Sequence, residues 1–260
     1  MIAAATAFDI RGPVAYFTIN RPDPGNAMTW GMYDALVDAC ERVDASAEVR
    51  TLVVRARGAT FCTGTDISQF ATFSTREEGL QYERRLEACV SRLERVAVPT
   101  IAQVEGVAAG GGCAIALACD LRVCSPAARF GVPIARTLGN GLSFENCARL
   151  VEHFGIGRAK TILLAGGFID AADAKAAGAV TKLVEPGQVE RVVDELASTL
   201  ARNAPLTMRA AKQALARLTS RNRADAGEIA NLVADCYASA DFREGVSAFL
   251  AKRSPKFTGR

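Results

Sequence analysis

The sequence predicts an α/β fold, with a β/α core over residues 1–200 and an all-helical region over residues 201–260. Short apolar runs rich in β-branched residues alternate with helix-like patterns as far as Pro186, and only helix-like patterns follow it. Such alternation is typical of parallel strands joined through helices rather than through hairpins. The 260 residues are also enough to bury one sizeable core.

The predicted strands are short segments of high β-propensity. The first, "VAYFTINR" at residues 14–21, is rich in β-branched and aromatic side chains, and the turn sequence "RPDPGNA" follows it. The second, "RTLVVRA" at residues 50–56, is apolar enough to be buried. The remaining predicted strands are residues 100–106, 121–125 and 181–186.

The predicted helices carry apolar residues at helical spacing. Thr29 is placed to cap a helix that runs to about Asp44, and residues 76–97 form a long amphipathic pattern that Pro99 ends. A short helix is expected to open at the triple glycine, residues 110–112. The C-terminal helices are predicted at residues 189–201, 206–218 and 225–250.

Composition excludes several functional classes. Lys and Arg total 31 against 28 Asp and Glu, so a concentrated basic face for nucleic acid is not expected. The longest uncharged run, residues 106–119, is too short to span a bilayer, and the first residues lack the basic start of a signal peptide. Eight cysteines without a CxxC pair, and the single His153, predict no metal site. Reduced cysteines of this kind indicate a cytoplasmic protein.

The glycine-rich stretch "AAGGGCAIALACD", residues 108–120, carries the first functional signal. At a strand-to-helix junction, the first helical N–H groups are unpaired and carry partial positive charge. Glycines there let a ligand oxygen approach those groups closely. No Lys-Ser/Thr follows the glycines and their spacing is not G-x-G-x-x-G, so a carbonyl oxygen is favoured over a phosphate. Close packing of helix on strand is the alternative explanation.

A second loop, "FCTGTD" at residues 61–66, follows the buried second strand. Gly64 leaves room around the amide of Thr65. Parallel strands deliver their following loops to one edge of a sheet, so the amides of Thr65 and Gly111 are expected to converge on one oxygen. That arrangement is an oxyanion hole.

Four ordered motifs across the chain resemble the enoyl-CoA hydratase/isomerase family, also called the crotonase superfamily. They are "INRPDPGNAMT", "GATFCTGTDISQF", "VEGVAAGGGCAIALACDLRVCSPAARFGVP" and "DFREGVSAFLAKRSPKFTGR". The resemblance implies a spiral of ββα turns with a helical C-terminal trimerisation region, assembled as a trimer or as a hexamer of two trimers. It also implies an acyl-CoA thioester substrate and no separate cofactor, since coenzyme A is part of that substrate.

The resemblance assigns roles to positions of this chain. The amides of Thr65 and Gly111 are implied to hold the thioester oxygen. Phe249 and Lys252 are implied to reach the adenine or phosphate of coenzyme A from a neighbouring subunit. The coenzyme A channel is implied to be lined by Gly25, Asn26, Ala27, Cys62, Gly64, Asp66, Ile67 and Gly110.

The chain departs from the hydratase pattern at two positions. Where hydratases of the family carry glutamates that handle the attacking water, this chain has Ala114 and Ile134. Neither side chain can carry a proton, so hydration is disfavoured relative to isomerisation or decarboxylation, which need mainly a stabilised enolate. Glu105 and Glu145 are the acid/base candidates nearest in sequence to these positions. His153 is expected to be solvated near a helix end.

Two other readings of the same features remain open. The chain could be a non-catalytic member that binds an acyl-CoA or serves as a scaffold. It could also be an acyl-CoA thioesterase, which would need a carboxylate beside the oxyanion hole to activate water.

Overall fold

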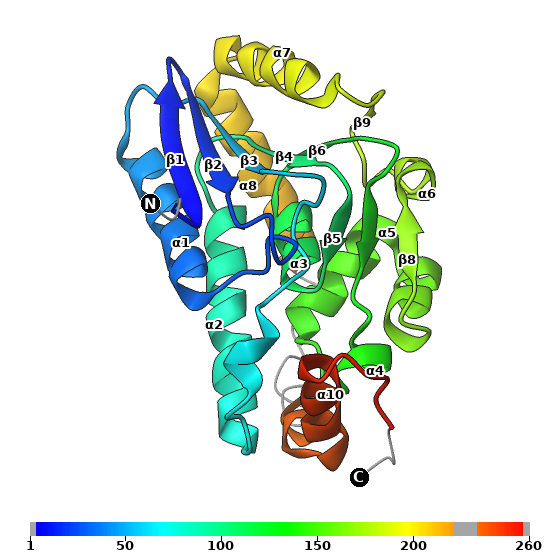
Figure 1. Cartoon of the computed structure of the whole chain (residues 1–260). Helices are drawn as coiled ribbons and strands as arrows, with labels where there is room; N and C mark the ends of the chain where they lie inside the picture. Colours follow the sequence, from blue (N-terminus) through cyan, green and yellow to red (C-terminus); the bar gives the residue numbers. More distant parts are fainter. Residues whose placement is uncertain (1–3, 221–232, 257–260) are drawn as a thin grey trace.

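The computed structural model describes residues 4–220 and 233–256. Its largest element is a six-stranded sheet of order β1-β2-β3-β4-β6-β9, seen on the left and at the centre of Figure 1. Within this sheet, the strands β2, β3, β4, β6 and β9 run parallel to one another. Their bounds are β1 Thr6–Arg11, β2 Val14–Ile19, β3 Thr51–Ala56, β4 Thr100–Val104, β6 Leu121–Cys124 and β9 Lys182–Leu183.

The expectation that no strands are joined by hairpins is wrong at the N-terminus. Strand β1 pairs antiparallel with β2, from Thr6 opposite Ile19 to Arg11 opposite Val14. Gly12, at φ 56°, makes the two-residue turn between them, where a positive φ suits the twist of a hairpin. Because β1 is an edge strand with half-exposed side chains, its sequence lacks the apolar run by which the other strands were predicted.

A second, smaller sheet has the order β5-β7-β8 and was not expected from the sequence. Its strands are three residues each: β5 Val107–Ala109, β7 Arg129–Gly131 and β8 Phe168–Asp170. Strands β7 and β8 pair antiparallel, a second exception to the all-parallel prediction. Segments of three residues are too short to show a strand period. Strand β5 of this sheet ends at Ala109, directly before the triple glycine.

Helices α1, α2, α7 and α8 follow their predicted segments closely, and α3 begins within the triple glycine as expected, whereas η1, α4 and α6 were not among the predicted helices. Thr29 precedes α1 as its N-cap residue but accepts no side-chain hydrogen bond, whereas Thr75 forms a full capping box with Glu78 at the start of α2. The bounds are α1 Trp30–Ala45, η1 (a 3₁₀ helix) Ile67–Phe70, α2 Arg76–Glu94, α3 Gly111–Ala118, α4 Ile134–Thr137, α5 Phe144–Leu164, α6 Ala171–Ala176, α7 Val189–Arg202, α8 Pro205–Ser220 and α10 Ala240–Leu250.

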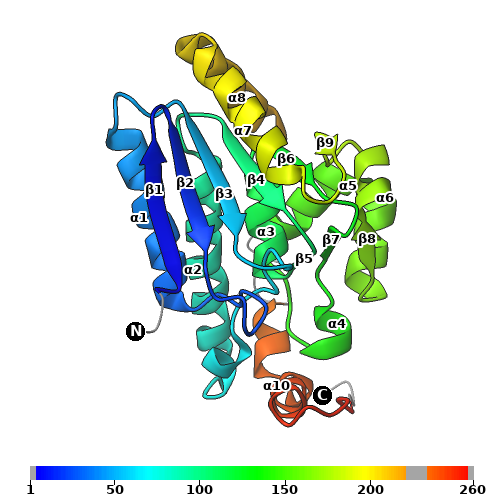
Figure 2. The ribbon, with the colours of Figure 1, turned by 45° about the horizontal axis from the view of Figure 1, so that its top comes forward.

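Helices cover both faces of the large sheet, which makes its central strands almost continuously buried. On β2, Phe17 packs into the larger core with α1, α2 and α3, while Tyr16 packs on the opposite face with α7. Figure 1 shows α7 at the upper edge of the molecule, α8 behind the large sheet and α10 at the lower edge, and Figure 2 shows α7 and α8 together at the top.

The single helix expected over residues 225–250 is wrong. Residues 233–238 are helical, and the chain then breaks at Ser239, whose side chain caps α10 through the amide of Phe242. A serine with extended backbone at an N-cap starts a new helix in a new direction. Residues 225–232 of the predicted helix lie outside the described residues. The break lets α10 pack against η1, below the sheet.

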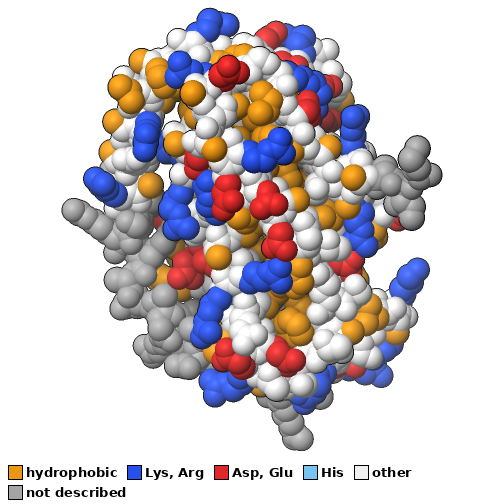
Figure 3. Space-filling model, turned by 90° about the vertical axis from the view of Figure 1, so that its left-hand side faces the viewer, with side chains coloured by type: hydrophobic (Ala, Val, Ile, Leu, Met, Phe, Trp, Pro, Cys, Tyr) orange, Lys and Arg blue, Asp and Glu red, His pale blue; other side chains and the backbone are white. Residues whose placement is uncertain are grey.

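The described surface mixes charges of both signs. Figure 3 shows basic and acidic side chains interspersed over the face on the left of Figure 1, without a region of one sign. No helix among residues 4–220 and 233–256 is long and apolar enough to cross a membrane. All eight cysteines are free thiols.

The expectation that His153 is solvated is wrong. The side chain is half-buried, and burial, with the nearby Arg122 guanidinium, lowers its pKa to about 3. The residue does precede a helix break, because Gly155 adopts non-helical angles within α5. The imidazole is therefore neutral at physiological pH and packed inward.

Candidate active site

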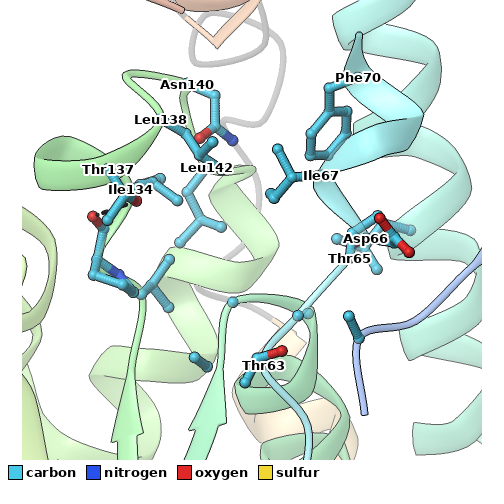
Figure 4. Close-up of a pocket in the computed structure, with 18 of the residues that line it drawn as sticks. Thr63, Thr65, Asp66, Ile67, Phe70, Ile134, Thr137, Leu138, Asn140 and Leu142 are labelled. Atoms are coloured by element: carbon cyan, nitrogen blue, oxygen red, sulfur yellow. Dashed lines mark hydrogen bonds between the residues drawn. The ribbon is translucent and has the colours of Figure 1, made fainter. Parts of the chain in front are cut away.

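A pocket of about 360 Å³ lies at the N-terminal end of α3. Figure 4 shows it between two walls: Ile134 and Thr137 of α4 on one side, and Ile67 and Phe70 of η1 on the other. Thr63 and Thr65 lie toward one end and Asn140 toward the other. The pocket therefore collects residues that are far apart in the chain.

Glycine is required at the start of α3 for steric reasons. Gly110 adopts φ 51° and ψ −122°, which side chains other than hydrogen rarely allow. A Cβ at Gly111 would lie 2.3 Å from the Tyr33 hydroxyl, and one at Gly112 would lie 2.3 Å from the Cys62 carbonyl. The triple glycine thus lets the helix end pack closely against its neighbours, which supports the packing explanation of the glycines; access of a ligand oxygen stays a prediction.

The 58–66 loop is held on both sides by short parallel bridges. Cys62 pairs with Ala108 of β5, and Thr65 pairs with Met28. In the second bridge the Met28 amide donates to the Gly64 carbonyl, and the Asp66 amide donates to the Met28 carbonyl. Because successive peptide groups of an extended chain point to opposite sides, the amide of Thr65 faces away from Met28.

The amides of Thr65 and Gly111 are close neighbours without partners. Within the described residues, neither amide donates a hydrogen bond. A Cβ at Gly64 would lie 3.5 Å from the Gly111 nitrogen, and one at Gly111 would lie 3.5 Å from the Thr65 hydroxyl oxygen. Both residues line the pocket. Adjacent free amides at a helix N-terminus suit the oxygen of a polarised carbonyl.

Two buried tyrosines fix the position of Thr65. Its hydroxyl lies 2.8 Å from the Tyr33 hydroxyl and 2.8 Å from the Tyr82 hydroxyl. Burial raises the pKa of both tyrosines, so they remain neutral hydrogen-bonding groups. Sequence analysis missed this chain of hydroxyls, because its members come from α1, the loop and α2 and share no local pattern.

Ala114 and Ile134, the two departures from the hydratase pattern, both line the pocket. Val132, Leu138 and Leu142 lie with them on the same lining. These five lining residues therefore offer methyl groups and no proton carrier.

The predicted site residues fall into two groups. The pocket lining includes Ala27, Gly64, Thr65, Asp66, Ile67, Gly110, Gly111 and Phe249. The lining does not include Gly25, Asn26, Cys62, Glu105, Glu145 or Lys252.

Gly25, Asn26 and Cys62 build the loops instead of facing the pocket. Asn26, at φ 58°, is fully buried; its side-chain amide donates to the carbonyls of Arg57 and Thr60. Gly25 accepts from the amide of Thr63. Burial raises the pKa of the Cys62 thiol to about 12, so this sulfur is not a nucleophile at neutral pH.

Asp66 lines the pocket as a paired carboxylate. Its side chain lies 2.6 Å from the Arg21 guanidinium and accepts from the amide of Ser68, which caps η1. Burial raises its pKa, but the hydrogen bonds from Ser68 and Arg21 outweigh burial and lower it overall. Asp66 therefore stays ionised and orders the loop.

Glu105 and Glu145 lie away from the pocket. Glu105 accepts from the side chain of Gln103 at the end of β4. Glu145 sits in the first turn of α5, which Ser143 caps, and it lines a different cavity.

Phe249 of α10 lines the pocket of its own chain while remaining 54% exposed. Lys252 is exposed two residues beyond the end of α10. The contact of both residues with coenzyme A of a neighbouring subunit stays a prediction.

Glu83 of α2 is a pocket residue that sequence analysis missed. It is 6% exposed, and burial is the main cause that raises its pKa to about 7. Its carboxylate accepts from the Tyr237 hydroxyl at 2.7 Å and from the Ser143 amide at 3.0 Å. Its neighbours in sequence, "YERRLE", are typical of the polar side of a surface helix, and the carboxylate is contacted by Ser143 and Tyr237, which are distant in the chain.

Comparison with known proteins identifies the family of this chain. The family model for enoyl-CoA hydratase/isomerase matches residues 9–260. The chain belongs to the enoyl-CoA hydratase/isomerase family. The 2,3-dehydroadipyl-CoA hydratase of Escherichia coli is 34% identical to it, over 95% of this chain and 96% of that protein. The short-chain-enoyl-CoA hydratase of Clostridium acetobutylicum is 32% identical, over 93% of each.

The fold expected from the resemblance is confirmed by solved structures of the family. Methylmalonyl-CoA decarboxylase complexed with 2S-carboxypropyl-CoA matches with a TM-score of 0.89 at 25% identity, over 100% of both chains. The mixed α/β core with two sheets and C-terminal helices is therefore the crotonase fold. The similar proteins include two hydratases and a decarboxylase, so the shared fold does not determine which reaction is catalysed.

Proposed function

We propose that this chain is an acyl-CoA enzyme that holds a thioester enolate with the amides of Thr65 and Gly111. The observation that carries the proposal is the pair of neighbouring, unpartnered amides on one pocket wall. An enolate concentrates negative charge on the thioester oxygen, and preorganised N–H donors stabilise that charge as it forms. Each such donor contributes about 3–4 kcal/mol to lowering the barrier.

Water addition is not the reaction we propose. Hydration needs a positioned acid/base for the attacking water. Ala114 and Ile134 line the pocket at the positions where family hydratases carry glutamates, and Val132, Leu138 and Leu142 line the same pocket. Migration of a double bond between carbons of the acyl chain avoids this requirement, because it needs only a stabilised enolate and one group that moves a proton.

Crotonyl-CoA hydration tests the proposal. The purified protein is expected to bind saturated butanoyl-CoA in calorimetry and to hydrate crotonyl-CoA slowly or not at all. The double variant Ala114→Glu/Ile134→Glu is expected to raise the hydration rate at least tenfold, because it supplies two carboxylates to the same pocket. Rapid hydration by the unchanged protein would contradict the proposal, and absence of acyl-CoA binding would remove its basis.

Decarboxylation of a malonyl-type thioester is the second candidate. Loss of CO₂ leaves the same enolate. An apolar wall destabilises the charged carboxylate of the substrate relative to the neutral CO₂ that is released, which favours decarboxylation. The likeness to a solved methylmalonyl-CoA decarboxylase favours this candidate as well. Release of CO₂ from methylmalonyl-CoA separates it from isomerisation. Release of free thiol from the same thioesters would instead indicate a thioesterase, and binding without turnover a non-catalytic member.

A further inference from the structure

Glu83 is a buried carboxylate in the pocket wall that the proposed function does not use. It lines the pocket together with Tyr82 and Leu86 of the same helix. Tyr82 and Thr65 share a hydrogen bond between their hydroxyls, so α2 runs alongside the two free amides. Asp66, the other carboxylate on the lining, is held by Arg21. Glu83 is thus the carboxylate of the lining without a cationic partner among the described ion pairs.

The hydrogen bonds of Glu83 keep its carboxylate fixed and able to accept a proton. The Asn140 side-chain amide donates to the Gly141 carbonyl and to the Tyr237 hydroxyl, each over 3.1 Å. The Gly141 carbonyl can only accept, which identifies the Asn140 atom bonded to it as the NH₂ group. Because this NH₂ group also donates to the Tyr237 hydroxyl oxygen, the hydroxyl proton of Tyr237 is free to point to the Glu83 carboxylate. Asn140 and Glu83 both line the pocket, and Tyr237 joins them from behind.

We propose that Glu83 is the catalytic acid/base of this chain and that its reaction is the conversion of a 3-enoyl-CoA into a 2-enoyl-CoA. The proposal rests on the proposed function, since it needs a thioester held by Thr65 and Gly111. The Glu83 carboxylate takes a proton from Cα, and the C–H electron pair forms a dienolate whose charge lies on the thioester oxygen. The protonated Glu83 carboxyl, whose proton can exchange with solvent, then delivers a proton to Cγ, which moves the double bond from Cβ–Cγ to Cα–Cβ and returns the carboxylate. Atoms and charge balance without a co-reactant.

The surroundings of Glu83 suit this role. Burial raises its pKa to about 7, and the charges of Glu87 on α2 and Glu145 on α5 raise it further, while Tyr237 and the Ser143 amide lower it. Arg149 pairs with Glu87 and leaves Glu83 unpaired. A carboxylate that titrates near neutral pH is an efficient proton carrier in both directions.

The test uses trans-3-hexenoyl-CoA with the full-length protein. Conversion to the 2-enoyl thioester is followed by its conjugated absorbance, and deuterium incorporation at Cα and Cγ is followed in D₂O. Glu83→Gln is expected to lower both rates by about 100-fold or more, with the dissociation constant of hexanoyl-CoA changed less than about threefold. Glu83→Asp is expected to recover part of the rate.

Three control variants make the outcome specific. Glu77→Gln, on the exposed side of the same helix, is expected to change the rate less than threefold. The same change at Glu105 and Glu145 tests the carboxylates suggested by sequence alone, and both are expected to retain the rate. A rate that survives Glu83→Gln, or one that Glu105→Gln or Glu145→Gln abolishes instead, overturns the proposal.

A pH profile separates a catalytic from a structural role. The rate is expected to rise with pH through about 7, as Glu83 ionises, and then to level off. Tyr237→Phe removes a donor that stabilises the carboxylate, so the midpoint is expected to move to higher pH. An unmoved midpoint contradicts the role given to Glu83. If hexanoyl-CoA binds but 3-hexenoyl-CoA neither isomerises nor exchanges, this inference fails alone; if hexanoyl-CoA does not bind, the proposed function fails too.

Discussion

At the scale of single residues, Gly111 is the position where packing and proposed chemistry meet. Gly111→Ala places a methyl group 2.3 Å from the Tyr33 hydroxyl, which must move and take the Thr65 hydroxyl with it. Because both proposed oxyanion donors are displaced, turnover of an acyl-CoA substrate is expected to fall at least ~100-fold. Steady-state kinetics with 3-hexenoyl-CoA measures this effect.

A matched pair of variants isolates the cause. Tyr33→Phe/Gly111→Ala removes the clashing oxygen and is expected to recover part of the lost rate. Gly157→Ala in α5, where a Cβ would have nothing within 4 Å, is expected to leave the rate unchanged. Equal losses in Gly111→Ala and Gly157→Ala would show that the site is not responsible.

Two titratable residues, the half-buried His153 and the buried Glu83, predict opposite pH slopes of stability. His153 has a folded pKa of about 3, so below about pH 6.5 the unfolded chain binds a proton that the folded chain does not, and stability falls as pH falls. Glu83 has a folded pKa of about 7, so between about pH 4.3 and 7 the folded chain holds the extra proton, and stability falls as pH rises.

Urea unfolding at pH 5, 6 and 7 measures these slopes. Relative to the unchanged protein, His153→Gln is expected to gain stability on acidification, and Glu83→Gln to lose it. Each slope is expected to differ from the unchanged protein's by about 1 kcal/mol per pH unit. Parallel curves for all three proteins would contradict the assigned burial of both groups.

Residue identity predicted one part of the site and not the other. Gly64, Gly110 and Gly111 stand out in the sequence because the chain gives up side chains where backbone must approach closely. Glu83 carries no such local mark. Its burial depends on Tyr237, 154 positions away, and a charged residue in an amphipathic helix is ordinarily expected on the surface.

At the scale of elements, long apolar or strongly amphipathic segments were predictable and short or half-exposed ones were not. Helix α2 was predicted from its periodicity and ends within three residues of the expected position. Strands β5, β7 and β8 are too short to show a period, and β1 lies at an edge. The break at Ser239 was missed because the apolar spacing continues through it and only the cap marks it.

Helix α10 is expected to control access to the pocket through its packing on the chain beneath it. A Cβ at Gly245 would lie 2.3 Å from the Leu138 carbonyl, and backbone at that distance cannot yield as a flexible side chain can. Gly245→Ala is therefore expected to shift α10, which carries Phe249 of the pocket lining, and to weaken hexanoyl-CoA binding by about tenfold or more.

Calorimetry with hexanoyl-CoA measures the effect of this shift. Gly31→Ala in α1, where a Cβ would meet nothing within 4 Å, serves as the control and is expected to bind normally. Unchanged affinity in Gly245→Ala would contradict the role given to α10.

At the scale of the whole molecule, the resemblance predicts self-association, and this stays a prediction, as does the division of the chain at residue 200. Helix α8 leaves large apolar side chains exposed, including Leu206 at 78% and Leu215 at 63%. Light scattering after size-exclusion chromatography is expected to give three or six times the 27.5 kDa of one chain. The double change Leu206→Glu/Leu215→Glu is expected to lower that mass, and a monomer in the unchanged protein would contradict the prediction.

The fold of the whole molecule was predictable because four motifs span the chain, whereas the reaction was not. The motifs specify where the backbone must turn and where two backbone segments must pack closely. The choice among hydration, isomerisation and decarboxylation depends on which side chains the packed elements bring to the pocket, such as Ala114, Ile134 and Glu83. Those neighbours are set by tertiary packing.

A crystal structure with hexanoyl-CoA bound tests the central claim most directly, through two distances. The thioester oxygen is expected about 2.7–3.1 Å from both the Thr65 nitrogen and the Gly111 nitrogen. A thioester oxygen that faces away from these amides, or that contacts only one of them, would contradict the account.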